Sequence, residues 1–222
     1  RPQVVRPSRG GATVRSDLGR VPAHRPDVGA EATKKDLIEM ATRPDFRKNP
    51  KDASREMDGW LGRTHHGYRD LNQSIKAALM YFTVAWSIFE YKALGTHASL
   101  DTIEKFVSTK ALNGTSLGDF EEAHEYFRNR YITGGKANAS FSHLVGKDTE
   151  VATRIQDVLL GHTSEPSDKL IALLLIVYRL RNNMLHGVKW KWGVDDQHEN
   201  FEHATSIIMT TLDIFLPDET TN

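Results

Sequence analysis

The chain has 222 residues, enough for one domain with an appendage, and its 29 basic residues balance its 29 acidic residues. This balance produces no overall field that would indicate a nucleic acid or a membrane as the partner. The absence of cysteine excludes disulfides, thiolate metal sites and cysteine nucleophiles, and it is compatible with the reducing cytoplasm, where we expect the protein. The longest apolar runs fall short of the roughly 18 to 20 residues of a membrane span, so no membrane anchoring is expected.

The N-terminal segment is rich in Arg, Pro and Gly and shows neither helical nor strand periodicity. Six arginines stand against two aspartates within residues 1–28. We interpret residues 1–32 as a flexible arm or linker whose charge suits an acidic polymer, with a solvated tail as the alternative. Residues 33–64 are expected to form a short helix followed by a loop, because Pro44 and Pro50 interrupt the helical pattern.

Helical periodicity dominates residues 65–222, which we expect to form a helical domain. Apolar residues recur at a spacing near 3.6, and the segments are bounded by cap-forming polar residues or by glycine. The expected helices cover residues 68–94, 100–112, 118–132, 148–161, 167–186 and 195–216. Only the short segment Val188–Trp192 is typical of a strand.

The helix expected over residues 167–186 is apolar on nearly every side from residue 170 to residue 178, which predicts neighbours all round it. The expected fold class is therefore all-α, a bundle of about five helices packed around this one. A bundle this small would leave one face of its central helix in water, so we expect a second copy of the chain to cover that face. This predicts a homodimer that pairs through the same helix.

A polar cluster follows the apolar run directly, in the order Arg181, Asn182, Asn183, Met184, Leu185, His186 and Gly187. A guanidinium and an imidazole are costly to bury unless they are paired or in use, so this cluster is the best candidate for chemistry. The negative end of the helix dipole favours the protonated imidazole of His186. The alternative is structural, with Arg181 paired to an acid and His186 capping the helix.

The segment Arg181–His186 has the form R-N-x-x-x-H and resembles the R-x(4–6)-H motif of the HEPN superfamily. Its continuation to Lys189 is similar to bacterial HEPN domains of defence and toxin systems, as is the segment Trp86–Glu90 on an earlier long helix. The resemblance covers about residues 65–216 and implies a helical fold with ribonuclease activity. Val188 stands where one antitoxin-regulated subgroup has a modified tyrosine, so control by nucleotidylation is not expected there.

In the site that this resemblance implies, two copies of the chain each contribute Arg181 and His186. The two residues lie roughly 140° apart on one helix, so a second helix across a two-fold axis helps to bring them into one cleft. One histidine would take the proton of the ribose 2′-OH, which attacks the adjacent phosphorus, and the other would protonate the leaving 5′-oxygen. Arg181 would bind the phosphate, and Asn182 would orient the site, with Asn183 a weaker candidate for that role. Glu90 is a further catalytic candidate, because acidic residues of the first long helix often complete HEPN sites; a solvated glutamate is the alternative.

Cations and indoles alternate just after the motif, at Lys189, Trp190, Lys191 and Trp192. Stacking of an unpaired base on an aromatic side chain contributes about 1–3 kcal/mol to single-strand binding. We therefore expect Lys189, Trp190 and Lys191, together with Asn183, to contact RNA. Packing of the two indoles against the bundle is the alternative.

Neither a metal ion nor another cofactor is expected. His65 and His66 are adjacent and lie outside a predicted helix, and His198 and His203 are five residues apart. Neither pair has the i, i+4 spacing of a helical zinc site. The glycine pairs of the chain are not followed by Lys and Ser or Thr, so the sequence does not support a nucleoside triphosphatase.

These patterns together predict a metal-independent endoribonuclease of the HEPN type, which acts as a homodimer in phage defence or as a toxin. Its expected partners, besides the RNA substrate, are an antitoxin, an activator or further domains of a larger effector. The alternative is a non-catalytic HEPN module that binds RNA or a nucleotide, or that dimerises a larger effector.

Overall fold

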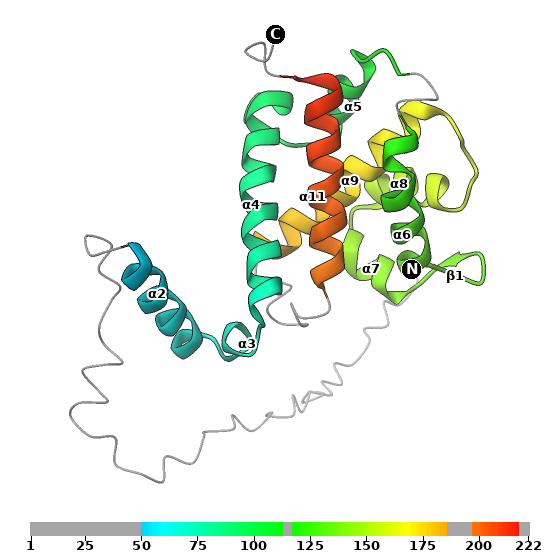
Figure 1. Cartoon of the computed structure of the whole chain (residues 1–222). Coiled ribbons are helices and arrows are strands. Elements are labelled where there is room, and N and C mark those ends of the chain that lie inside the picture. Colours follow the sequence, from blue (N-terminus) through cyan, green and yellow to red (C-terminus); the bar gives the residue numbers. More distant parts are fainter. Residues whose placement is uncertain (1–49, 113–116, 186–196, 218–222) are drawn as a thin grey trace, which may run out of the picture. The chain divides into compact units, whose positions relative to one another are not determined.

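The computed structural model describes residues 50–112, 117–185 and 197–217. These residues are mostly helical, with nine α-helices, one short 3-10 helix and a two-stranded hairpin (Figure 1). The elements are α2 (Pro50–Thr64), α3 (His66–Arg69), α4 (Gln73–Leu94), α5 (Leu100–Ser108), η1 (Gly118–Phe120), α6 (Glu121–Tyr131), β1 (Ile132–Thr133), β2 (Lys136–Ala137), α7 (Ala139–Val145), α8 (Thr149–Leu159), α9 (Pro166–Leu185) and α11 (His198–Phe215). The helical class predicted from the sequence is thus confirmed, with more helices than the five or so expected.

Helix α2 occupies a stretch in which a loop was expected. Pro50 begins this helix instead of interrupting it, because proline lacks only an N–H that the first turn leaves without an intrahelical partner. Asp52 in the first turn and Arg63 in the last turn have the signs that the helix dipole favours. The short helix expected before it, over residues 33–40, and the arm of residues 1–32 lie outside the described residues.

The long helix expected from Tyr68 begins five residues later, as α4. Asn72 provides the reason, since its side-chain oxygen accepts a 2.9 Å hydrogen bond from the backbone N–H of Ile75 and so caps a new helix. Tyr68 belongs to the separate short helix α3, where its hydroxyl donates to Asp58 of α2. The caps predicted at Ser99 and Asp148 are confirmed, each accepting a hydrogen bond from a backbone N–H three residues later.

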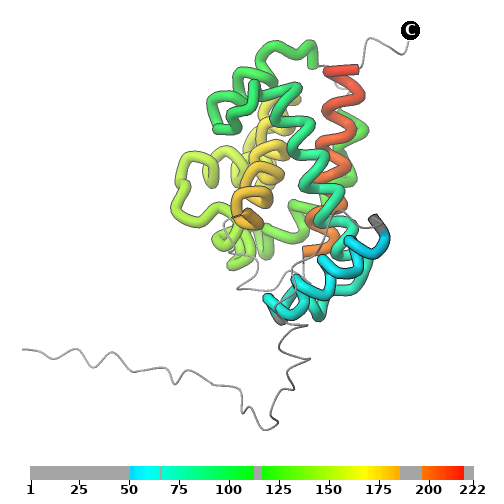
Figure 2. The backbone as a smooth tube through the Cα atoms, turned by 90° about the vertical axis from the view of Figure 1, so that its left-hand side faces the viewer, coloured from blue at the N-terminus to red at the C-terminus, as the bar shows by residue number. Residues whose placement is uncertain are grey.

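Helix α9 is the central element of the described fold (Figures 1 and 2). Its residues 172–177 are at most 1% exposed, because α5, α7, α8 and α11 of the same chain surround them. The neighbours predicted on all sides are therefore present within one chain. The expectation that a second copy is needed to cover this part of the helix is wrong, since four helices of the same chain cover it.

Helix α4, the longest element, packs its apolar face against α11 and the C-terminal half of α9. Phe82 stacks on Phe201 of α11 with ring centres 5.2 Å apart, and the ring of Trp86 lies 6.3 Å from that of Tyr178 of α9. These contacts place the last two turns of α9 beside the middle of α4. None of the helices in the described ranges combines the length and the apolar character that crossing a membrane requires.

Candidate functional site

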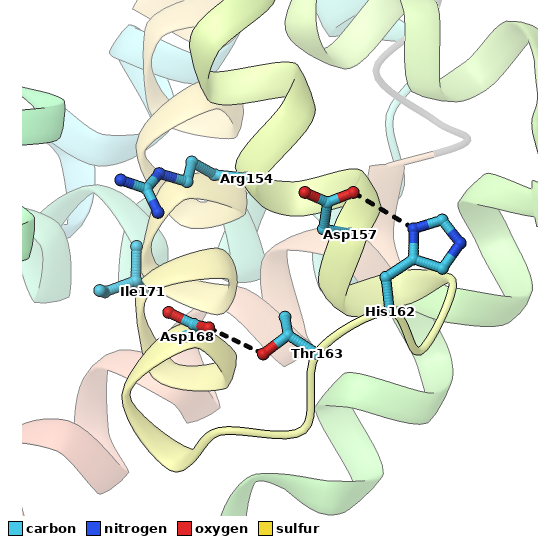
Figure 3. Close-up of a pocket in the computed structure, with 6 residues that line it drawn as sticks. All are labelled: Arg154, Asp157, His162, Thr163, Asp168 and Ile171. Atoms are coloured by element: carbon cyan, nitrogen blue, oxygen red, sulfur yellow. Dashed lines mark hydrogen bonds and ion pairs between the residues drawn. The ribbon is translucent and has the colours of Figure 1, made fainter.

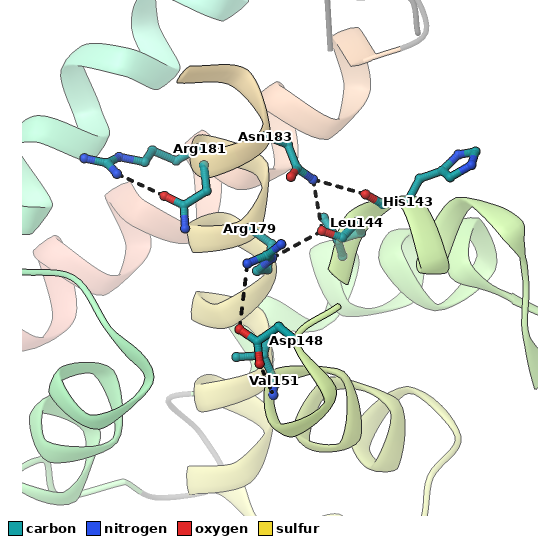
Figure 4. A network of polar contacts seen from close by, with 8 residues as sticks. His143, Leu144, Asp148, Val151, Arg179, Arg181 and Asn183 are labelled. Atoms are coloured by element: carbon teal, nitrogen blue, oxygen red, sulfur yellow. Dashed lines mark hydrogen bonds and ion pairs between the residues drawn. The ribbon is translucent and has the colours of Figure 1, made fainter. Parts of the chain in front are cut away.

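Two sets of polar contacts fix the C-terminal end of α9, on opposite sides of the helix. Figure 4 shows Arg181 pointing to one side of α9, whereas Asn183 points to the other side, toward α7. The apolar run of the helix is enclosed from Ala172 to Val177, and half-buried residues begin at Tyr178 and include Arg181 and Asn182. The side chains of this last part therefore emerge at the surface of the core.

The guanidinium of Arg181 is held beside α4. Its Nη1 donates to Oδ1 of Asn182 over 2.9 Å, and its Nη2 lies 3.4 Å from Oε2 of Glu90. Its central carbon also lies 5.7 Å from the ring centre of Trp86, within the range of a cation–π contact. The Arg181 and Glu90 side chains are 26% and 19% exposed, so this ion pair is partly shielded from water.

Glu90 is fixed in turn by Trp86, one helical turn earlier on α4. The indole Nε1–H donates to Oε2 of Glu90 over 2.9 Å, and this is the same oxygen that faces Arg181. No role for Trp86 was predicted from the sequence, although the i, i+4 spacing of Trp86 and Glu90 is a signal for this contact. The structure thus brings together three of the four predicted catalytic residues, Arg181, Asn182 and Glu90.

Arg181 retains capacity for another acceptor. A guanidinium carries five N–H donors, and two of those on Arg181 are used by Asn182 and Glu90. The buried Nε of Arg181 has no acceptor among the described residues. Because Nε is buried, the remaining N–H groups of Nη1 and Nη2 are the ones that another acceptor could reach.

Asn183 serves packing and does not face the Arg181 side. Its side chain is buried, and its Nδ2 donates to the backbone oxygens of His143 over 3.3 Å and Leu144 over 2.9 Å (Figure 4). Arg179 makes a similar contact, with its Nε donating to the oxygen of Leu144 and its Nη1 3.8 Å from Asp148. Asn183 is therefore unsuited to the RNA contact expected from the sequence, because both of its N–H groups are committed to α7.

The remaining predicted site residues lie outside the described residues. These are His186, Lys189, Trp190 and Lys191, with the expected strand Val188–Trp192 that contains the last three. Leu185, the last described residue of α9, marks where His186 follows in the chain. Among the described residues no three His, Asp or Glu side chains lie together in a way that could hold a metal ion.

A polar hollow of about 210 Å³, separate from the Arg181 cluster, lies where α8 leads into α9 (Figure 3). It is lined by Arg154, Asp157, His162, Thr163, Asp168 and Ile171. Asp157 lies 3.3 Å from His162, Thr163 donates to Asp168 over 2.8 Å, and Arg154 pairs with Glu104 over 2.9 Å. Because these polar side chains already have partners, we assign the hollow no function.

The chain was also compared with known proteins. No family model matches it, and neither a curated protein nor a solved structure gives a match.

Proposed function

We propose that the protein is a metal-independent endoribonuclease of the HEPN type, acting in phage defence or as a toxin. The main support for the proposal is the position of the Arg181 guanidinium. Asn182 and Glu90 hold it, and some of its N–H groups have no acceptor among the described residues. His186 follows five residues later in the chain. The resemblance of Arg181–His186 to the R-x(4–6)-H motif supplies the reaction class. An antitoxin, an activator or further domains of a larger effector remain proposed partners.

In the proposed reaction, Arg181 binds the phosphate through its unused N–H groups and stabilises the charge that develops on the equatorial oxygens. The imidazole of one His186 takes the proton from the ribose 2′-OH, whose oxygen forms a bond to the adjacent phosphorus. The bond from phosphorus to the 5′-oxygen breaks, and the 5′-oxygen leaves with a proton from the protonated His186 of a second copy. The products are a 2′,3′-cyclic phosphate and a 5′-hydroxyl, and no oxidant or metal enters the balance.

Glu90 and Trp86 act in this proposal by positioning. The carboxylate holds the guanidinium on the α4 side, and the indole holds the carboxylate. Asn182 and Glu90 use one N–H group each of Nη1 and Nη2, so the second N–H group of each nitrogen is proposed to donate to the phosphate while these two partners stay in place. Lys189, Trp190 and Lys191 are proposed to bind the flanking RNA.

Cleavage of RNA in the presence of EDTA tests the proposal. Purified protein is incubated with total RNA and with a defined single-stranded oligonucleotide, and the fragment ends are analysed for 2′,3′-cyclic phosphate. The wild type is expected to cleave, and Arg181→Ala and His186→Ala are each expected to be slower by about 100-fold or more. Arg154→Ala and His162→Ala remove the same two functional groups elsewhere and are the matched controls, which should cleave like the wild type.

Two results would contradict the nuclease proposal. One is RNA that stays intact with the wild type and both motif variants in all conditions, including those with cell extract as a source of activator. The other is cleavage that continues undiminished in His186→Ala, which would identify a contaminating enzyme.

A non-catalytic module that binds RNA or a nucleotide is the second candidate. The ion pair between Arg181 and Glu90 favours it, because the carboxylate offsets part of the positive charge that would stabilise a phosphate in the transition state. This candidate predicts RNA binding without cleavage. Affinities measured across a series of salt concentrations should fall with salt, with a slope that decreases when Lys189 or Lys191 is replaced by Ala.

A further inference from the structure

The outward face of α4 is apolar and exposed to solvent. Its large side chains are Met80, Tyr81, Val84, Ile88 and Tyr91, which are 54%, 61%, 54%, 44% and 71% exposed. Met80 and Tyr81 are adjacent, and the others follow at spacings of three or four residues, which places all five in one stripe along the helix. This stripe lies opposite the core-facing Phe82, Trp86 and Phe89. We refer to these five residues as the α4 face.

The α4 face is a cluster and not a random scatter of exposed side chains. Seven large apolar side chains are exposed in the described part of the chain, and five of them belong to the α4 face. The other two flank it on the neighbouring helices, Leu185 at the end of α9 and Met209 on α11. Met209 and Tyr81 also line a groove of about 540 Å³ between α4 and α11, so the apolar surface continues beyond the helix itself.

The size of this surface matches one side of a protein interface. Side chains of this kind with about half of their surface exposed present on the order of 100 Å² each, so the seven together present roughly 700 Å². Single exposed patches on monomers reach about 300–600 Å², whereas each partner in a standard interface buries about 800 Å². An isolated monomer would leave an unusually large apolar area in water.

The five side chains of the α4 face are uncharged, and the nearest charge in line with them is the exposed Lys92, one turn after Ile88. Neutrality over the middle of the helix favours a second copy as the occupant. A two-fold interface places the same patch on both partners, so any charge near the axis would face its own copy and be repelled. The smaller residues on the same side of the helix, Ala77 and Ser87, are also neutral. The basic arm of residues 1–32 would find no carboxylate among the five side chains of the α4 face. Glu90, on the flank of the stripe, is engaged by Arg181 and Trp86, and Glu202 and Asp213 line the groove beside the face.

We propose that the α4 face is the interface of a homodimer, with the α4 helices of two copies packed against each other. The inference concerns assembly and stands on the exposed surface. Its consequence for catalysis rests on the proposed function: α4 also carries Glu90, and Leu185 at the margin of the face directly precedes His186. Pairing through α4, and not through the enclosed part of α9, thus joins two copies beside their Arg181 clusters.

The double variant Val84→Glu and Ile88→Glu tests the interface, because it brings four carboxylates together across the two-fold axis while changing only exposed positions. The control is Ser142→Glu with Thr153→Glu, which adds the same charge at exposed positions of α7 and α8. Molar mass is measured by sedimentation equilibrium without RNA. The wild type and the control are expected at twice the chain mass of 25.0 kDa, and the α4 variant at the mass of one chain with an unchanged helical circular dichroism spectrum.

A cysteine cross-link decides the question should the double variant unfold. The chain has no cysteine, so Val84→Cys forms a disulfide only between two copies. Under mild oxidation we expect Val84→Cys to give a covalent dimer much faster than Ser142→Cys at the same concentration. Equal rates, a wild type that is monomeric at all concentrations, or a folded α4 variant that is still dimeric would each overturn the proposal.

The two proposals fail separately in these experiments. If the protein is a dimer through the α4 face but leaves RNA intact, the interface proposal stands and the nuclease proposal fails. If the α4 variant is folded, still dimeric and active, the nuclease proposal stands and the α4 interface fails.

Discussion

Asn182 and Asn183 are neighbours in the chain with different surroundings. Asn182 is half-buried and accepts a hydrogen bond from Arg181, whereas Asn183 is buried and donates to two backbone oxygens of α7. Adjacent residues of a helix are about 100° apart, which is enough here to separate a side chain of the candidate site from one that supports the core.

Replacing each asparagine by alanine should separate these roles. We expect Asn183→Ala to lower the free energy of unfolding by about 1–3 kcal/mol, because two carbonyls of α7 would lose a buried donor. Asn182→Ala should cost less than about 1 kcal/mol, because its partner Arg181 keeps its contacts with Glu90 and Trp86. Urea denaturation measures both, and an equal loss in the two variants would contradict the assignment.

His124 of α6 gives the protein a defined pH dependence. Burial lowers the pKa of His124 below its ordinary value of 6.5, and the charge of Lys169 lowers it further, against the opposing effect of Glu121. The folded protein therefore holds this imidazole neutral, and the unfolded chain takes up the proton first as the pH falls. The stability contributed in this way is present above about pH 6.5 and is lost as the pH decreases toward the lowered pKa.

We therefore expect His124→Gln to lose less stability than the wild type when the pH falls from about 7.5 to about 5.5. Urea denaturation at each pH measures this difference. His162→Gln, at an exposed histidine, is the control and should follow the wild type. Parallel stability profiles for the wild type and His124→Gln would show that this histidine does not contribute.

At the scale of elements, α4 determines where the candidate site lies. Asn72 caps its beginning, and Gly95 ends it with a left-handed backbone, at a φ of 60°. Between these ends one side of the helix faces the core, a flank carries Glu90 toward Arg181, and the outer side forms the α4 face. A single helix thereby joins the core, the candidate site and the proposed interface.

The end of α4 provides a test of this element. We expect Gly95→Ala to lower the free energy of unfolding by about 1 kcal/mol, because a side chain is disfavoured at a left-handed backbone position. Gly118→Ala is the matched control, since neither glycine has an atom within 4 Å of the added Cβ and only Gly95 of the two has a positive φ. The control should be unchanged or more stable by less than about 1 kcal/mol. Equal losses measured by urea denaturation would exclude backbone strain as the cause.

Helix α9 also combines an enclosed apolar part with a polar part that carries site residues. Its apolar run is enclosed by the chain's own helices, and its polar end is held by Asn183 and Arg179 on one side and Arg181 on the other. The periodicity of the run predicted an enclosed helix, and this prediction is confirmed. The identity of the enclosing elements depended on how α5, α7, α8 and α11 pack around it, and of these α5 is the most distant in sequence.

At the scale of the whole molecule, folding and assembly are linked if the α4 face pairs two copies. A dimer that dissociates on unfolding becomes more stable as the protein concentration rises, by mass action. We expect the urea midpoint of the wild type to increase with protein concentration, and that of Val84→Glu with Ile88→Glu to stay constant. A wild-type midpoint that does not depend on concentration would indicate that unfolding is independent of pairing.

The sequence by itself determined the helical class, the caps at Ser99 and Asp148, and the candidate cluster at the end of α9. These features are local, since caps, glycine stops and apolar periodicity act within a few residues. The break before α4 and the start of α2 at Pro50 were equally local, but each signal allowed two outcomes. Asn72 can cap a helix or lie within a loop, and proline can begin a helix or interrupt one.

Only the tertiary structure decided which apolar surfaces are covered. The stripe of α4 and the run of α9 are both apolar in sequence, yet α9 is enclosed and the α4 face is exposed. It also decided that Glu90 meets Arg181 while Asn183 turns to α7, across separations of 91 and about 40 residues. Such contacts depend on how the helices pack, which the periodicity of any one helix does not contain.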